Sequence, residues 1–147
     1  MSGYQHILVG IDFTPEEERV ITRAADMARH FQARLSLIHV VEYLHVDLAN
    51  ELVLPQDLEL ETQIVDTARN KLARLAARLD EFGEITQWVE LGSTKQEILR
   101  VAEEEKVDLI VVGSHGRHGI GRLLGSTANG VLHGAPCDVL AVRVRED

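Results

Sequence analysis

The chain has 147 residues, a length typical of one compact domain, and 45% of its residues are hydrophobic. Its 15 Lys and Arg against 24 Asp and Glu give a formal net charge of −9, which argues against general binding to nucleic acid or to anionic membranes. No apolar run approaches a membrane span, the amino terminus lacks a signal-peptide pattern, and the single Cys137 fits a reducing compartment. We therefore expect one cytoplasmic domain over residues 1–147.

The first part of the chain predicts a strand, a helix and a second strand. The mostly apolar run from His6 to Ile11 predicts the first strand. Thr14, Pro15 and Glu17 form a capping box with a proline at the first helical position, which predicts that a helix begins there. The second strand is predicted from Leu35 to Val41. Within the helix, apolar residues recur at helical spacing: Val20, Ala24, Ala28 and Phe31.

The middle of the chain predicts a loop, a long helix and a third strand. The polar segment from Glu42 to about Leu58 contains Pro55 and is predicted to be the longest loop. A third strand is predicted from Ile85 to Leu91. Between them, apolar residues alternate steps of three and four, which predicts one long helix with an apolar face: Val65, Ala68, Leu72, Leu75, Leu79 and Phe82.

The last part of the chain predicts two more helices and two more strands. Thr94 to Glu97 forms a second capping box, so we expect a helix to begin there. Leu109 to Val112 predicts the fourth strand, and Val139 to Val144 predicts the fifth. Between these strands, Ser126 or Thr127 is expected to cap a short helix.

Alternating strands and helices are typical of right-handed crossovers onto a parallel sheet. The first, second and fourth strands are nearly continuous apolar runs, as expected for strands covered by helices on both faces. Polar residues such as Thr86 and Gln87 place the third strand at one edge, and Arg143 places the fifth strand at the other. We therefore predict an α/β fold with one doubly wound, five-stranded parallel sheet and helices on both faces.

The strand order then reverses between the first and fourth strands. Open α/β sheets bind ligands at the carboxyl ends of the strands at such a reversal. A ligand crevice is therefore predicted at that edge of the sheet. The residues there are Gly10, Ile11 and Asp12 after the first strand, and Val112, Gly113 and Ser114 at the end of the fourth.

A glycine-rich segment from Gly113 to Thr127 follows the fourth strand. It lies within residues 109–137, which contain no Asp or Glu, although the overall frequency of acids predicts about five there. Glycines let the backbone approach a ligand closely, and the amino end of the next helix attracts anions. Arg117 and Arg122 add positive charge. These features predict a phosphate-binding loop.

Other interpretations of this segment remain open or fit less well. It could be a tight, flexible turn that binds nothing, because loops after strands are often rich in glycine. Gly121 to Thr127 is one residue short of a Walker A loop and lacks its lysine. Gly119 and Gly121 lack the third glycine of a dinucleotide-binding motif. His115, His118 and Cys137 fall short of a closed zinc site.

Three segments together resemble the universal stress protein family: Gly113 to Gly116, Gly125 with Ser126, and Ile7 to Thr14. The resemblance spans nearly the whole chain and includes Ile38 to Val40 and Val107 to Gly113. It implies the strand order 3-2-1-4-5, and a homodimer formed through the last strand. One branch of the family binds ATP through the pattern Gly-x2-Gly-x9-Gly-(Ser/Thr). Here eight residues, not nine, separate the second and third glycines.

The resemblance also implies roles for individual residues. Asp12 and Val40 would flank the adenine of a bound ATP, AMP or ADP, with Gly10, Ile11, Val112 and Arg117 beside the crevice. Asp12 has an alternative role as the cap of a turn before Thr14. Ribose and phosphates would be held by Gly113, Ser114, His115, Gly116, Gly125, Ser126 and Thr127.

Three functions follow from these observations. The first is a nucleotide-responsive stress or signalling module without robust catalysis, because no Walker lysine or acidic pair near the loop is available to hold magnesium. We expect magnesium only together with a nucleotide, and no other metal. The second is a dimeric interaction protein of the same fold that needs no nucleotide. The third is a slow ATPase.

Two further residues are predicted to have structural roles rather than to contact a ligand. Glu17 is interpreted as a first-turn acid that complements the helix dipole. His39 lies within an apolar strand and is interpreted as a hydrogen-bonded core histidine.

Overall fold

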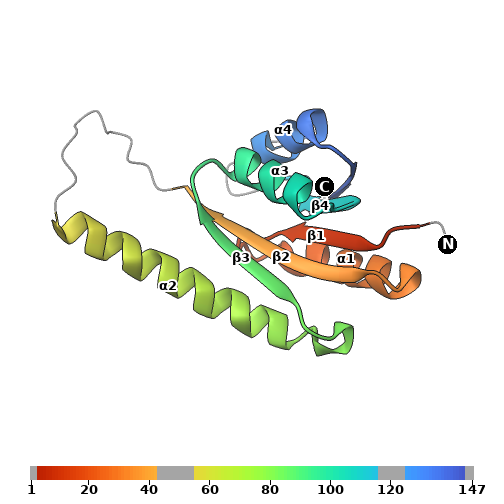
Figure 1. Ribbon diagram of the computed structural model, residues 1–147, viewed down its shortest axis with the longest axis horizontal. Coiled ribbons are helices and arrows are strands. Elements are labelled where there is room, and N and C mark those ends of the chain that lie inside the picture. The colour runs from red at the N-terminus through yellow and green to blue at the C-terminus, as the bar shows by residue number, and fades with distance from the viewer. Residues whose placement is uncertain (1–2, 43–54, 116–124, 145–147) are drawn as a thin grey trace.

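The computed structural model describes residues 3–42, 55–115 and 125–144, with the side chains of 55–58 excepted. The helices and strands alternate along the chain, as Figure 1 shows. In order they are β1 (His6–Gly10), α1 (Glu17–Phe31), β2 (Arg34–Val41), α2 (Pro55–Ala77), the short 3₁₀ helix η2 (Asp80–Phe82), β3 (Thr86–Leu91), α3 (Thr94–Glu104), β4 (Leu109–Gly113), α4 (Ser126–Gly134) and β5 (Asp138–Val142).

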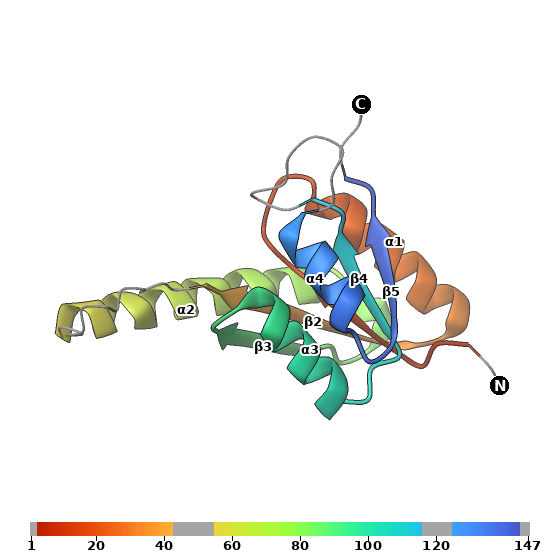
Figure 2. The same ribbon diagram turned by 90° about the horizontal axis from the view of Figure 1, so that it is seen from above.

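The five strands form one parallel sheet in the order β3-β2-β1-β4-β5, as predicted. β1 and β4 are neighbours, with Leu8 paired to Ile110, so the order reverses between them. Helices α1 and α2 cover one face of the sheet, and α3 and α4 cover the other (Figures 1 and 2). The doubly wound α/β fold is therefore confirmed.

The alternation of side chains along the strands divides the core into two layers. Ile7 and Val9 of β1 face α1 and α2, whereas Leu8 between them faces α3 and α4. All three side chains are almost fully buried. Strands covered on both faces need apolar residues at every position, which explains the continuous apolar runs of β1, β2 and β4.

The amino ends of the helices differ from the predicted ones. Helix α1 begins at Glu17, because Thr14 forms a turn in which its carbonyl accepts from the Glu17 amide at 3.0 Å. The cap of α3 is Ser93, whose side chain accepts from the Gln96 amide at 3.3 Å, one residue before the predicted cap. The cap of α4 is Gly125, so neither Ser126 nor Thr127 caps it. Each cap is displaced by one or two residues from the predicted one.

Helix α2 starts earlier and ends earlier than its apolar pattern predicts. Pro55 begins the helix, although it was expected to interrupt a loop. A proline suits the first helical position because its fixed φ is helical and an amide there has no partner within the helix. The helix ends at Ala77, so the buried Leu79 lies beyond it and Phe82 belongs to η2. The apolar residues therefore keep their helical spacing beyond the end of the helix itself.

Within the described residues, none of the helices combines the length and the apolar character needed to cross a lipid bilayer.

Candidate functional site

The carboxyl ends of β1 and β4 lie next to each other at one edge of the sheet. Past the end of β4, the Ser114 amide donates to the Val142 carbonyl of β5 at 2.7 Å. The Gly125 amide donates in turn to the Ser114 carbonyl at 2.7 Å, which brings the start of α4 beside the end of β4. The structure therefore places Ser114, His115 and Gly125 next to one another after β4. Asp12 follows the neighbouring strand β1, on the other side of the point where the strand order reverses.

The first turn of α4 presents backbone amides without a side-chain cap. Gly125 is the cap residue, with an extended φ of −64° and ψ of 160°, and it has no side chain that could bond the first-turn amides. The first N–H groups of any helix lack acceptors within the helix and carry the positive end of its dipole. Ser126 and Thr127 lie in this turn. The arrangement suits an anion.

Ser114 and His115 form a polar pair beside the start of α4. Ser114 is buried, and its hydroxyl lies 3.1 Å from Nδ1 of His115. Nε2 of His115 is buried too, and it has no hydrogen-bond partner among the described residues. When Nδ1 accepts from the hydroxyl, Nε2 carries a proton and becomes an unsatisfied donor. Buried donors usually have a hydrogen-bond partner. An acceptor atom of a bound ligand would supply the bond that Nε2 lacks.

Asp12 organises the loop between β1 and α1. One of its carboxylate oxygens accepts from the Thr14 amide at 3.1 Å and from the Thr14 hydroxyl at 2.8 Å. Phe13 between them has a φ of 60°, in the left-handed region. The alternative role of Asp12 as the cap of a turn is therefore confirmed.

Glu17 has a role that the sequence pattern missed. Its carboxyl group accepts from the amides of Asp12 at 2.5 Å and of Phe13 at 2.7 Å, and it is 7% exposed. Burial and a hydrogen bond with the Asp12 carboxylate raise its pKa to about 8, although the two amide bonds act in the opposite direction. Glu17 lies in the first turn of α1, as predicted. It is also a buried anchor of the β1–α1 loop, which the helix-dipole interpretation did not include.

His39 fixes the end of β1 from the neighbouring strand. Its Nδ1 lies 2.7 Å from the Ile11 carbonyl, and its ring packs against that of Phe13 with centroids 4.5 Å apart. The prediction of a hydrogen-bonded histidine is confirmed. A polar residue inside an apolar strand was the signal that could be found in the sequence.

Two glycines at the ends of β1 and β4 lie in tightly packed surroundings. A Cβ at Gly10 would lie 3.1 Å from Val112 and 3.3 Å from Ile98. A Cβ at Gly113 would lie 3.3 Å from Val20, Val144 and the His115 carbonyl. These contacts account for the missing side chains whether or not a ligand is bound.

The remaining predicted site residues fall into two groups. Ile11, Val40 and Val112 are buried in the core, with 4%, 7% and 3% of their surface exposed. Gly116 and Arg117 lie outside the described residues. Within the residues that the structure describes, no three His, Cys, Asp or Glu side chains are grouped as metal ligands.

Comparison with known proteins agrees with this architecture. The model of the Universal stress protein family matches residues 3–143. Universal stress protein A homolog 1 of Coxiella burnetii (strain RSA 493 / Nine Mile phase I) is 42% identical over 97% of this chain and 99% of its own. Universal stress protein UspA from Lactobacillus plantarum is 26% identical, with a TM-score of 0.81 over 97% of this chain and 100% of its own.

A further solved relative was determined with a ligand. It is a universal stress protein in complex with cAMP, which is 26% identical to this chain and has a TM-score of 0.68. The match covers 98% of this chain and 100% of that structure. Given the match to the family over nearly its whole length, the chain belongs to the universal stress protein family.

Proposed function

We propose that this chain binds an adenine nucleotide, ATP, ADP or AMP, at the edge of the sheet where β1 and β4 end. The observation that carries the proposal is the first turn of α4, which follows a glycine cap and lies beside Ser114 and His115. Nε2 of His115 is buried and has no hydrogen-bond partner in the part of the chain that the structure describes. Backbone amides at a helix amino terminus and a buried imidazole donor suit the oxygens of a phosphate.

The charge distribution supports an anionic ligand there. Residues 109–137 contain no acid, although the chain has a formal net charge of −9. The carboxylate of Asp12 lies in the loop after the neighbouring strand, where it suits the ribose or adenine rather than the phosphates. A related universal stress protein has been solved with cAMP, another adenine nucleotide.

We further propose that nucleotide binding regulates this chain and that the chain does not hydrolyse the nucleotide robustly. Phosphoryl transfer needs a metal-bound phosphate and a positioned nucleophile. The acids next to the crevice, Asp12 and Glu17, are engaged in hydrogen bonds within the β1–α1 loop. A module of this kind would act in the cytoplasm by changing a surface that a partner recognises. Phosphate release above background that disappears in Asp12→Ala would instead establish a slow ATPase.

The His115→Phe variant is expected to bind ATP at least tenfold more weakly than the natural chain. The substitution keeps a planar ring but removes the Nε2 donor, and a hydrogen bond to a charged group contributes about 1.5–3 kcal/mol. Isothermal titration calorimetry with ATP and AMP measures the change. His133→Phe is the matched control, because His133 is an exposed histidine at the carboxyl end of α4.

Two results would contradict these proposals separately. If the natural chain shows neither binding heat nor thermal stabilisation at millimolar ATP or AMP, nucleotide binding is rejected and the nucleotide-independent interaction protein remains. If ATP binds but His115→Phe and His133→Phe bind it equally well, His115 makes no contact with the phosphates.

We also propose that the chain forms a homodimer through its last strand, over Val139 to Val144. β5 is an edge strand, since it pairs with β4 on one side only. The Val142 carbonyl points to β4, where it accepts from Ser114. Polar backbone groups alternate along a strand, so those of Ala141 point to the open side. An open edge of this kind can pair with a second copy.

The Ala141→Pro variant is expected to weaken the dimer without unfolding the chain. Proline removes the outward-pointing amide of Ala141 but leaves the ladder to β4, and edge strands tolerate it at such positions. Sedimentation equilibrium measures the dimer constant, with Ala141→Ser as the control that keeps the amide. An unchanged constant in Ala141→Pro would show that the last strand is not the interface.

A further inference from the structure

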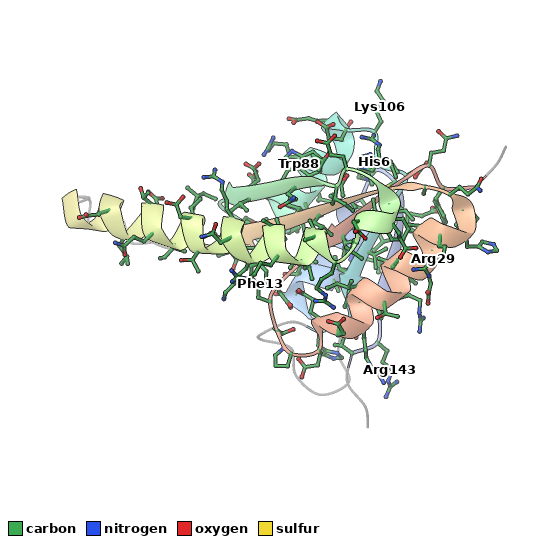
Figure 3. The ribbon with its side chains drawn as sticks, turned by 90° about the horizontal axis from the view of Figure 1, so that it is seen from below. His6, Phe13, Arg29, Trp88, Lys106 and Arg143 are labelled. Carbon is green, nitrogen blue, oxygen red and sulfur yellow. The ribbon has the colours of Figure 1, made fainter. Side chains whose placement is uncertain are left out.

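A cleft of about 310 Å³ lies between the amino end of α1 and the second half of α2. It is on the sheet face that α1 and α2 cover, whereas α4 covers the opposite face. The nucleotide proposed above would bind at the start of α4, so the cleft is a separate site. Phe13, which lines the cleft, lies beside α2 in Figure 3.

Three cations line the cleft: Lys71 and Arg74 of α2, and Arg78 directly after the end of that helix. The spacing of three residues places Lys71 and Arg74 along one side of α2. Arg78 pairs with Glu18, and the Lys71 ammonium lies 5.2 Å from the centre of the Phe13 ring. Arg74 has no ion-pair partner among the described residues. The cleft therefore has more cations than surface acids, in a chain that is strongly acidic overall.

The other acid of the cleft, Glu17, adds little negative charge near neutral pH. Its carboxyl group is turned to the amides of Asp12 and Phe13, and burial raises its pKa to about 8. Protonated Glu17 leaves Glu18 as the one ionised acid against Lys71, Arg74 and Arg78 among the lining residues. The net charge of the lining residues is therefore positive, so the cleft attracts an anion.

Apolar groups form the rest of the cleft. Ile21 and Leu75 lie at its base and are 6% and 8% exposed, and the Phe13 ring forms part of the wall. The volume falls at the lower end of the range of small-molecule sites, about 300–1,000 Å³. A ligand that matches this chemistry has an anionic group that contacts Arg74 and Lys71, and a short apolar part that packs on Ile21 and Leu75 at the base of the cleft.

We propose that the cleft between α1 and α2 binds a small organic anion, a carboxylate or a phosphate monoester attached to an aromatic or short aliphatic group. The two anionic heads share the chemistry that Arg74 recognises, because a guanidinium can donate two parallel hydrogen bonds to either. The ligand would touch Phe13, directly after Asp12 in the β1–α1 loop.

Amide chemical-shift mapping by NMR tests the proposal with three probes of similar size: benzoate, phenyl phosphate and the neutral benzyl alcohol. We expect saturable shifts at Phe13, Ile21 and Leu75 with at least one of the two anions, and binding of the alcohol at least tenfold weaker. The tighter of the two anions identifies the head group that the site prefers. Amides of Ser126 and Thr127 should remain unshifted.

The Arg74→Gln variant is expected to weaken binding of the preferred anion about three- to tenfold. Arg69→Gln is its matched control, because Arg69 is an exposed arginine on the same helix that pairs with Asp66 and does not line the cleft. The proposal is overturned if both variants weaken binding equally, if benzyl alcohol binds as tightly as the anions, or if the shifts map to Ser126 and Thr127. Failure of ATP to bind would leave it intact.

Discussion

The Glu17→Gln variant is expected to match the natural chain in stability near pH 5 and to exceed it on the order of 4 kcal/mol at pH 8. The size follows from the rise in the pKa of Glu17 from 4.5 to about 8, at about 1.4 kcal/mol for each pH unit. Glutamine keeps an oxygen to accept from the Asp12 and Phe13 amides, and its NH₂ replaces the proton shared with Asp12.

The sign follows from proton binding in the two states. Between pH 4.5 and 8 the folded chain keeps Glu17 protonated, whereas the unfolded chain has released that proton. The folded state therefore binds more protons, and the free energy of unfolding falls as the pH rises through this window. Glutamine does not titrate, so this loss is absent from the variant.

Urea unfolding at pH 5, 6, 7 and 8 measures the difference between the two proteins. Other titrating groups are common to both and cancel. Glu16→Gln is the matched control, because it removes one carboxyl group at an exposed position next to Glu17. A difference for Glu17→Gln that is the same at all four pH values would show that Glu17 is ionised in the folded protein.

The Leu72→Ala variant is expected to lose about 2–5 kcal/mol of unfolding free energy, through the lost apolar contacts and the cavity left behind. Leu72 is 0% exposed and packs α2 against the sheet. Leu60 lies on the same helix but is 49% exposed, so Leu60→Ala should change the unfolding free energy by no more than about 0.5 kcal/mol. Urea unfolding compares the two. Equal losses would mean that the first half of α2 is also covered by protein.

The layers of the fold could be predicted because they depend on local patterns. Strands covered on both faces need continuous apolar residues, and polar residues such as Thr86 and Gln87 belong at an edge. The sheet bears out both expectations, with β3 and β5 at its ends. The edge proposed to bind the ligand follows from the same order, since ligand sites of open parallel sheets lie where that order reverses.

The helix boundaries could not be predicted, because several amides compete for one side chain. Glu17 was expected three residues inside a helix capped by Thr14, yet its carboxyl group reaches back to Asp12 and Phe13. The left-handed φ of Phe13 turns those amides toward it, and this turn is closed by Asp12 and Thr14. The capping-box pattern contains the right residues but does not specify which amides they bond.

For this chain, the spacing of apolar residues was sufficient to infer the doubly wound sheet and the edge where its strand order reverses, and the gap in acidic residues predicted a preference for an anion there. Both are properties of composition and period that can be read along the chain. The buried state of Glu17, the packing role of Gly10 and the cleft between α1 and α2 could not be inferred in this way. Each depends on how closely residues distant in the chain approach one another, and only packing in three dimensions sets those distances.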